Sequence, residues 1–148
     1  MVDRAARDSA ASALRDFVNG SISNKEYERR YPRSKSDPAI LEIYVQAWFF
    51  CSDVREHTLT GKHVLTDENR TFFERCILFL RSDSEFQWPP TKISLWYPLL
   101  RLIGLGRVVN RKIEEAMSVG DKEVWPFLKK ADYDMTRVRT GDQYEPYW

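Results

Sequence analysis

The stretch SDPAILEIYVQAWFFC, residues 36–51, decides the fold. Asp37 is a residue type that caps helix N-termini, and a proline directly after it suits the first turn of a helix. A helix is therefore predicted from Pro38 to about Glu56. Its residues are apolar on nearly every side, and a helix of this kind is normally buried. We expect it to be the central helix, with Ile43, Ala47, Trp48 and Cys51 in the core.

Upstream of this segment, apolar residues recur at helical spacing. An Ala-rich helix is predicted over residues 3–19, with Gly20 as its C-cap. Ser23 and Glu26 form a capping box that begins a second, short helix. Pro32 ends that helix.

Downstream, Thr66 caps a helix predicted over about 67–81. A fifth helical region begins near residue 92 or 94 and contains breaks at Pro98, Gly104 and Gly106, and a sixth covers about 107–118. The segment EVWPFL, residues 123–128, contains a proline and is predicted to be extended, with a short edge strand as an option.

These patterns predict an all-α protein, a single-domain helical bundle of about five to six helices around the central helix. We place the domain at residues 1–136. The remaining residues, 137–148, are predicted to form a polar and aromatic tail that is not helical, because Gly141 and Pro146 disfavour a helix there.

Composition limits the classes of protein that fit. The chain has 148 residues, a net charge of +1 and 14% aromatic residues. This balance indicates neither nucleic acid nor a membrane surface as a partner. The N-terminus lacks an apolar leader, and the longest apolar run is shorter than the ~20 residues that span a bilayer. Cys51 and Cys76 lie in apolar stretches, so we expect buried, reduced thiols in a soluble, cytoplasmic protein.

Four stretches of the chain are similar to segments of known sequences: LRDFVNGSISNKEYERR (14–30), WFFCSDVREHTLTG (48–61), RCILFLRSDSEFQWP (75–89) and GDKEVWPF (120–127). Together they resemble a group of small, uncharacterised bacterial proteins. The resemblance implies a bacterial cytosolic setting, and it implies no activity.

One cluster of side chains has the chemistry for metal binding or acid–base catalysis: Asp53, Glu56, His57 and His63. On a helix that continues this far, Asp53 and His57 are four residues apart and share a face. A carboxylate and an imidazole so placed can bind a divalent metal, or one can orient the other. The competing interpretation is a solvated helix end, because the spacing matches no established metal motif.

Two further sets of residues are candidates for binding. A basic stretch with no acidic residue would suit nucleic acid, although its apolar residues have core spacing; it contains Lys92, Arg101, Arg107, Arg111 and Lys112. Aromatic side chains next to prolines and in the tail would suit a protein interface, although core packing is the stronger interpretation for the Trp-Pro pairs; they are Trp88, Trp125, Tyr144, Tyr147 and Trp148.

The leading hypothesis for function is a non-catalytic protein-interaction protein, in one form an immunity- or antitoxin-like protein. No convergent set of catalytic residues favours an enzyme, and we expect no cofactor. A small metal-dependent hydrolase that uses Asp53 and His57 is one alternative, and a nucleic-acid binder that uses residues 92–112 is the other. We expect the partner to be another protein, and the sequence leaves the oligomeric state open.

Overall fold

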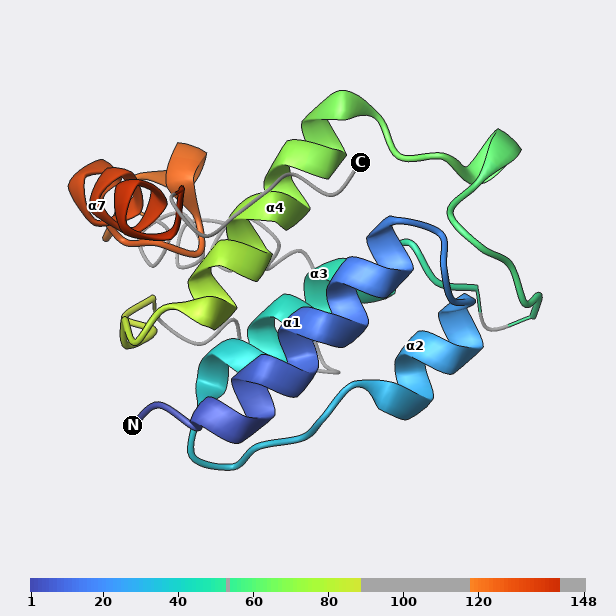
Figure 1. Ribbon diagram of the computed structural model, residues 1–148, viewed down its shortest axis with the longest axis horizontal. Coiled ribbons are helices and arrows are strands. Elements are labelled where there is room, and N and C mark those ends of the chain that lie inside the picture. The colour runs from blue at the N-terminus through green and yellow to red at the C-terminus, as the bar shows by residue number, and fades with distance from the viewer. Residues whose placement is uncertain (53, 89–117, 142–148) are drawn as a thin grey trace, which may run out of the picture.

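The computed structural model describes residues 1–52, 54–88 and 118–141 (Figure 1). These residues form five α-helices and two short 3-10 helices, without a strand, so a mostly α-helical domain is confirmed for the part of the chain described. The predicted helices near residue 92 and over 107–118 lie outside the described residues. In chain order the elements are α1 (Arg4–Val18), α2 (Asn24–Arg30), α3 (Pro38–Trp48), η1 (Gly61–His63), α4 (Asp67–Arg81), η2 (Lys122–Val124) and α7 (Lys130–Gly141).

Three predicted helix starts are confirmed, because the residue predicted to cap each helix does so. The side chains of Ser23, Asp37 and Thr66 each accept a hydrogen bond from a backbone N–H in the first turn of α2, α3 and α4. This contact satisfies one of the donors that every helix N-terminus leaves unpaired. After α1, Gly20 adopts a φ of 69°, which an L side chain rarely adopts, so the predicted glycine at this C-terminus is also confirmed.

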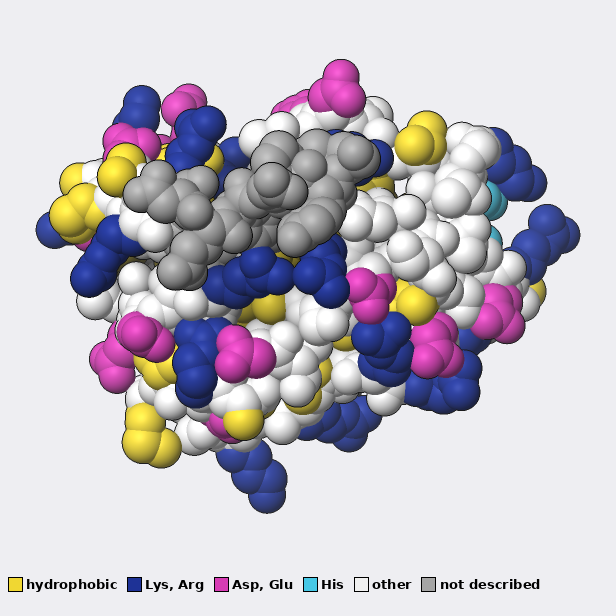
Figure 2. Space-filling model, viewed as in Figure 1, with side chains coloured by type: hydrophobic (Ala, Val, Ile, Leu, Met, Phe, Trp, Pro, Cys, Tyr) yellow, Lys and Arg dark blue, Asp and Glu magenta, His cyan; other side chains and the backbone are white. Residues whose placement is uncertain are grey.

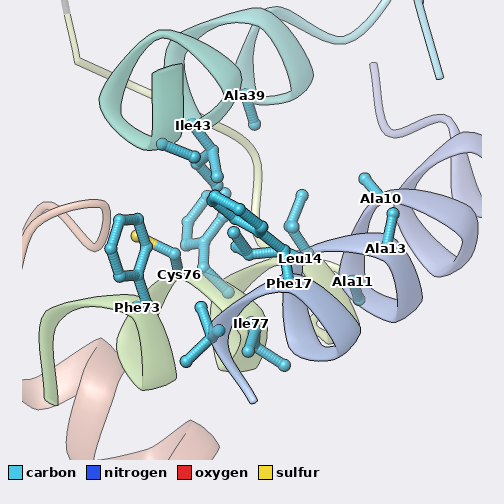
Figure 3. Packing of buried hydrophobic residues seen from close by; sticks show 14 of the residues in the cluster. Ala10, Ala11, Ala13, Leu14, Phe17, Ala39, Ile43, Phe73, Cys76 and Ile77 are labelled. Carbon is cyan, nitrogen blue, oxygen red and sulfur yellow. The ribbon is translucent and has the colours of Figure 1, made fainter. Parts of the chain in front are cut away.

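The Ala-rich helix α1 is the centre of the domain. It packs against α2, α3 and α4, and in Figure 1 it lies in front of α3 and beside α4. Its alanines at positions 10, 11 and 13 are at most 1% exposed, and such small side chains let the neighbouring helices approach closely. Figure 3 shows Leu14 and Phe17 of α1 pointing toward Ile43 of α3 and Ile77 of α4. The prediction that residues 38–56 form the central helix is therefore wrong.

Helix α3 is also shorter than predicted, because it ends at Trp48. Ile43 and Ala47 are fully buried, as expected, and Cys51 is partly buried. Trp48, however, is 43% exposed, so the expectation that it lies in the core is wrong. The loop that follows α3 is held by buried Asn24, whose side chain donates to the carbonyl oxygens of residues 52 and 55.

The C-terminal part differs from its prediction in two places. Residues 122–124 form the 3-10 helix η2, followed by turns and a cis Trp125–Pro126 peptide bond, so the optional edge strand at 123–128 is wrong. Helix α7 continues to Gly141, so the tail predicted from residue 137 is helical over its first five residues. Helix α7 has Asp132 in its first turn and Arg139 in its last, and these charges complement the helix dipole. A prediction from polarity alone overlooks this contribution.

Within the described residues, no helix has the length and apolar character that a membrane span requires.

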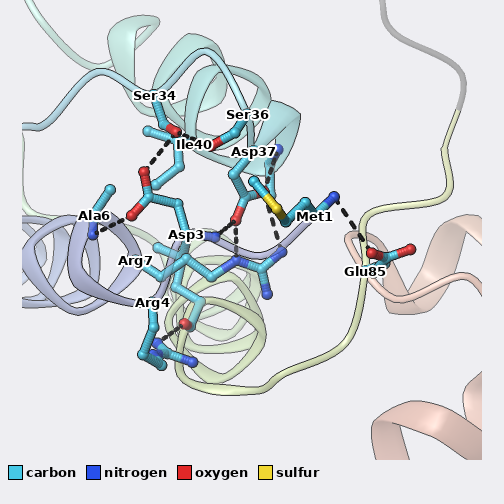
Figure 4. Close-up of polar contacts among 12 residues, drawn as sticks. Met1, Asp3, Arg4, Ala6, Arg7, Ser34, Ser36, Asp37, Ile40 and Glu85 are labelled. Carbon is cyan, nitrogen blue, oxygen red and sulfur yellow. Dashed lines mark hydrogen bonds and ion pairs between the residues drawn. The ribbon is translucent and has the colours of Figure 1, made fainter.

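A buried ion pair joins the ends of three helices (Figure 4). Arg7 of α1 and Asp37 at the start of α3 are 0% and 1% exposed. The Nε and Nη2 atoms of Arg7 donate to the two carboxylate oxygens of Asp37 at 2.6 and 3.1 Å. The remaining guanidinium nitrogen donates to the carbonyl oxygens of Ser82 and Ser84, just after α4, at 3.0 and 2.8 Å. Each of the three guanidinium nitrogens thus donates at least one hydrogen bond, and a buried charge needs such partners.

We predict that Asp37→Asn lowers the free energy of unfolding by ~3–5 kcal/mol, because it leaves the guanidinium of Arg7 buried without a counter-charge. The matched control is Asp8→Asn, which removes the exposed partner of Arg4 and should cost ~0–1 kcal/mol. Urea unfolding followed by circular dichroism measures both values. Equal losses for the two variants would contradict the role given to the buried pair.

The same pair predicts a pH dependence of stability. Burial by itself raises the pKa of Asp37, but hydrogen bonds from Arg7, Asp3 and Ala39 and the charge of Arg7 outweigh it and hold the pKa below its ordinary value of 3.8. The unfolded chain is therefore protonated first as the pH falls, so this stabilisation is complete above about pH 5 and is lost as the pH falls through the lowered pKa. We expect the difference in free energy of unfolding between wild type and Asp37→Asn to be constant above about pH 5 and to decrease below about pH 4. A difference that stays constant in acid would contradict this assignment.

Candidate functional site

The loop that contains the predicted acid–histidine cluster is fixed by Asn24, the first residue of α2. Its side-chain amide is fully buried and donates to the carbonyl oxygens of Ser52 and Arg55 at 2.9 and 3.2 Å. The backbone N–H of His57 donates to the amide oxygen of Asn24 at 2.9 Å, and the backbone N–H of Asn24 donates to the carbonyl oxygen of His57 at 2.9 Å. Asn24 therefore fixes the loop at residue 52 and at residues 55–57, and residues 54–57 are not helical.

His57 does not lie on a helix, because α3 ends at Trp48 and residues 54–57 are not helical. The helical position that was assumed for His57 is therefore wrong. The two ring nitrogens of His57 lie 3.1 Å from the carbonyl oxygen of Phe50 and 3.3 Å from that of Arg55. Glu56 accepts a hydrogen bond from the hydroxyl of Ser23. These partners engage both side chains in local structure.

His63 is exposed, and its ring centroid lies 4.5 Å from that of His57. Desolvation and the neighbouring His57 and Lys62 lower the pKa of His63, which favours its neutral form at pH 7. Among the described residues, no three His, Cys, Asp or Glu side chains are grouped to hold a metal ion. Asp53 lies outside the described residues, so the cluster as a whole stays a prediction.

Cys76 is not an activated nucleophile. Cys76 is completely buried, and burial raises the pKa of its thiol well above the usual range, so the reactive thiolate is disfavoured. Cys51 is partly buried, and its Sγ lies 3.7 Å from the carbonyl oxygen of Ala47. No disulfide joins them, as predicted.

Trp88 and Trp125, two of the predicted interaction residues, are core residues. They are 4% and 9% exposed. The Nε1–H of Trp88 donates to the carbonyl oxygen of Phe127 at 3.1 Å, and the ring of Trp125 stacks on Phe72 with centroids 5.4 Å apart. Neither ring is available to a partner, in agreement with the alternative interpretation as core packing. The other predicted interaction residues, Tyr144, Tyr147 and Trp148, lie outside the described residues.

The predicted basic patch at residues 92–112 also lies outside the described residues. Among the side chains that Figure 2 draws in colour, Lys and Arg are interspersed with Asp and Glu, and histidine side chains show at the right-hand edge. That face of the molecule therefore carries no field of one sign over its coloured part.

The feature that sequence reasoning missed is the outer stripe of α3, defined here as Leu41, Val45, Trp48 and the adjoining Phe49. Leu41 and Phe49 are 61% and 67% exposed, and Val45 is half-buried. The positions 41, 45 and 48 recur at the i, i+4 and i+7 spacing of one helix face. The opposite face, with Ile43 and Ala47, is buried against the domain. The sequence shows apolar residues on all sides of this helix, but we interpreted that pattern as evidence for a completely buried helix.

A pocket of about 500 Å³ lies next to this stripe, between the loop 31–35 and α3. Tyr31, Tyr44 and Leu41 form part of its wall, and Arg33 and Lys35 lie at its side as exposed cations. The rings of Tyr31 and Tyr44 are tilted, with centroids 5.3 Å apart. The hydroxyl of Tyr31 donates to the carbonyl oxygen of Ile40 at 3.1 Å, which fixes this ring against α3.

Behind the pocket, Tyr27 stacks on Phe17 with centroids 4.7 Å apart and on Tyr44 at 6.0 Å. Tyr27 is fully buried, and its hydroxyl has no hydrogen-bond partner among the described residues. Burial and the neighbouring Tyr31 raise the pKa of Tyr27, so the phenol remains protonated. The hydroxyl of Tyr31 is thus satisfied, and that of Tyr27 is not satisfied by any described residue.

Comparison with family models, curated proteins and solved structures finds no match to this chain.

The two hydroxyls predict opposite effects of the same chemical change. Tyr27→Phe should leave the protein equally stable or up to ~1–3 kcal/mol more stable, because it removes a buried group without a partner. Tyr31→Phe should cost ~0.5–1.5 kcal/mol, because it removes the hydrogen bond to Ile40. Chemical denaturation of both variants measures the two signs. Destabilisation by Tyr27→Phe as large as that by Tyr31→Phe would show that the Tyr27 hydroxyl has a partner.

Proposed function

We propose that this chain is a non-catalytic protein-interaction protein that binds its partner through the outer stripe of α3. The observation that carries the proposal is the exposure of Leu41, Trp48 and Phe49 on one helix. Large apolar side chains grouped on a surface mark interaction sites more often than single exposed ones do. Trp48 and Phe49 also contact each other edge to face, with ring centroids 6.2 Å apart, and they present one continuous aromatic surface.

The size of the stripe fits the centre of an interface. From ~150–250 Å² per large aromatic ring and the exposed fractions of these side chains, a partner would cover roughly 300 Å² of apolar surface. At ~25 cal/mol per Å² this is about 7–8 kcal/mol before the costs of association. A stable interface buries about 800 Å² on each partner, so a polar rim would surround the stripe. Tryptophan is among the residue types that contribute most to binding when they lie at such a centre.

A concrete form of this function is a bacterial immunity- or antitoxin-like protein, whose partner is a protein that it neutralises. The size of the chain and the expected bacterial setting favour this form. The hydrolase and nucleic-acid alternatives depend on Asp53 and on residues 92–112, and no described residue adds an observation in their favour.

We predict that a photo-crosslinking amino acid at position 49, introduced in the native host, forms an adduct with one other protein. The matched control is the same amino acid at position 138 of α7, where Val138 is also exposed; it should give no such adduct. Mass spectrometry of the adduct identifies the partner. An adduct of twice the mass of the chain would show a second copy on the stripe, and equal adducts at both positions would show non-specific contact. Either result would refute the proposal.

Once the partner is identified, Trp48→Ala should weaken binding to it by ~30-fold or more, as for a central aromatic residue of an interface. Because Trp48 is half-exposed, this substitution should lower the free energy of unfolding by only about 1 kcal/mol. A loss of binding can therefore be distinguished from a loss of the fold. The exposed apolar residue Met135 of α7 provides the control variant Met135→Ala, which should bind normally.

If the chain is an immunity protein, expression of the partner alone should stop the growth of the host cells. Co-expression of the wild-type chain should restore it, and co-expression of Trp48→Ala should not.

A further inference from the structure

The pocket between the loop 31–35 and α3 has the size and lining of a small-molecule site. Its volume of about 500 Å³ lies within the ~300–1,000 Å³ of typical ligand pockets. Pro32, Ile40, Leu41 and the rings of Tyr31 and Tyr44 line it. Such walls favour a ligand with a flat apolar body, because aromatic rings pack well against one another in offset or edge-to-face contacts.

The charged side chains at the pocket determine which sign of charge on a ligand they favour. Several cations near the pocket are already paired: Arg29 with Glu26, and Arg30 with Asp16 at 2.8 Å. Arg33 and Lys35 differ from these, because neither forms an ion pair with any described residue. Two exposed cations beside an apolar cavity are complementary to an anionic group on the ligand.

The one acidic residue of the lining, Glu28, does not reverse this sign. Its Oε1 atom is buried, without a hydrogen-bond partner in the part of the chain that the structure describes, so it offers no surface to a ligand. Its Oε2 atom lies 3.9 Å from the ammonium group of Lys25, which offsets the charge. The accessible charge at the pocket is therefore positive.

We propose that this pocket binds a small aromatic carboxylate. The aromatic ring lies against Tyr44 and Leu41, and the carboxylate accepts hydrogen bonds from Arg33 and Lys35. The proposal does not require a protein partner, because Trp48 and Phe49 do not line the pocket and only Leu41 is shared with the outer stripe. Failure of the crosslinking experiment at position 49 therefore leaves this site intact, and failure here leaves the docking stripe intact.

Three fluorinated probes with the same ring test the proposal on the full-length chain: 5-fluoroindole-3-propionate, which is an anion; 5-fluorotryptamine, which is a cation; and neutral 5-fluoroindole. Broadening of the ¹⁹F resonance during titration with protein measures the binding of each. We expect the anion to bind at least about 10-fold more tightly than either of the others, as for a charge-assisted contact. Tighter binding of the cation would assign the site to the carboxylate of Glu28. That result, equal binding of all three, or no binding of the anion would overturn the proposal.

The variants separate the pocket from general charge. Arg33→Ala/Lys35→Ala should weaken the anion about 10-fold or more. The control, Lys62→Ala/Lys129→Ala, removes the same net charge at two exposed lysines outside the pocket and should leave its affinity unchanged. Leu41→Glu places an acid at an exposed position of the pocket wall and should abolish binding of the anion, while circular dichroism confirms an intact fold. Equal weakening by both double variants, or unchanged binding in Leu41→Glu, would show that the anion binds elsewhere.

Discussion

The ion pair between Arg7 and Asp37 is the constraint on which the rest of the structure depends. One guanidinium group contacts the start of α3 and the two carbonyl oxygens that follow α4, and it also lies over the ring of Phe79, 5.0 Å from its centroid. A buried charge is tolerated only when all its donors are paired. The three helices can therefore not shift independently, because any movement would leave part of this charge without a partner. This explains how α1, whose alanines offer little apolar area, can be the centre of the domain.

The same interaction sets the orientation of α3 about its axis. Asp37 binds Arg7 and also accepts a hydrogen bond from the backbone N–H of Ala39, so the first turn of α3 has one position relative to α1. From there the helical period places Ile40, Ile43 and Ala47 against the core. Leu41 and Trp48, offset from those positions by one residue, must face outward. The exposed stripe is thus a consequence of the buried pair and of helix geometry.

The sequence predicted what depends on local chemistry, and failed where distant residues decide. Ser23, Asp37 and Thr66 are caps whose partners lie within three residues, and all were predicted correctly. The loop after α3 is held by Asn24, which lies far from it in the chain and looks like an ordinary polar residue of a short helix. Arg7 resembles the solvated arginines around it, so its burial has no local signal. The candidate site was missed for the same reason, since apolarity on all sides of α3 does not tell which side the fold leaves open.

The two proposed binding sites meet at Leu41, which belongs to the outer stripe and also lines the pocket. Under the two proposals, its side chain would contact both a molecule in the pocket and a protein on the stripe. A molecule that occupies the pocket therefore changes the apolar surface that the partner meets. By linkage, the partner changes the affinity of the pocket by the same factor. The sign of this coupling follows from contact: a ligand that remains within the pocket adds apolar area beside Leu41 and favours the partner, whereas a ligand that protrudes over α3 competes with it. Asp37 positions the helix that carries both sites, so a single buried carboxylate links the stability of the fold to the geometry of its binding surface.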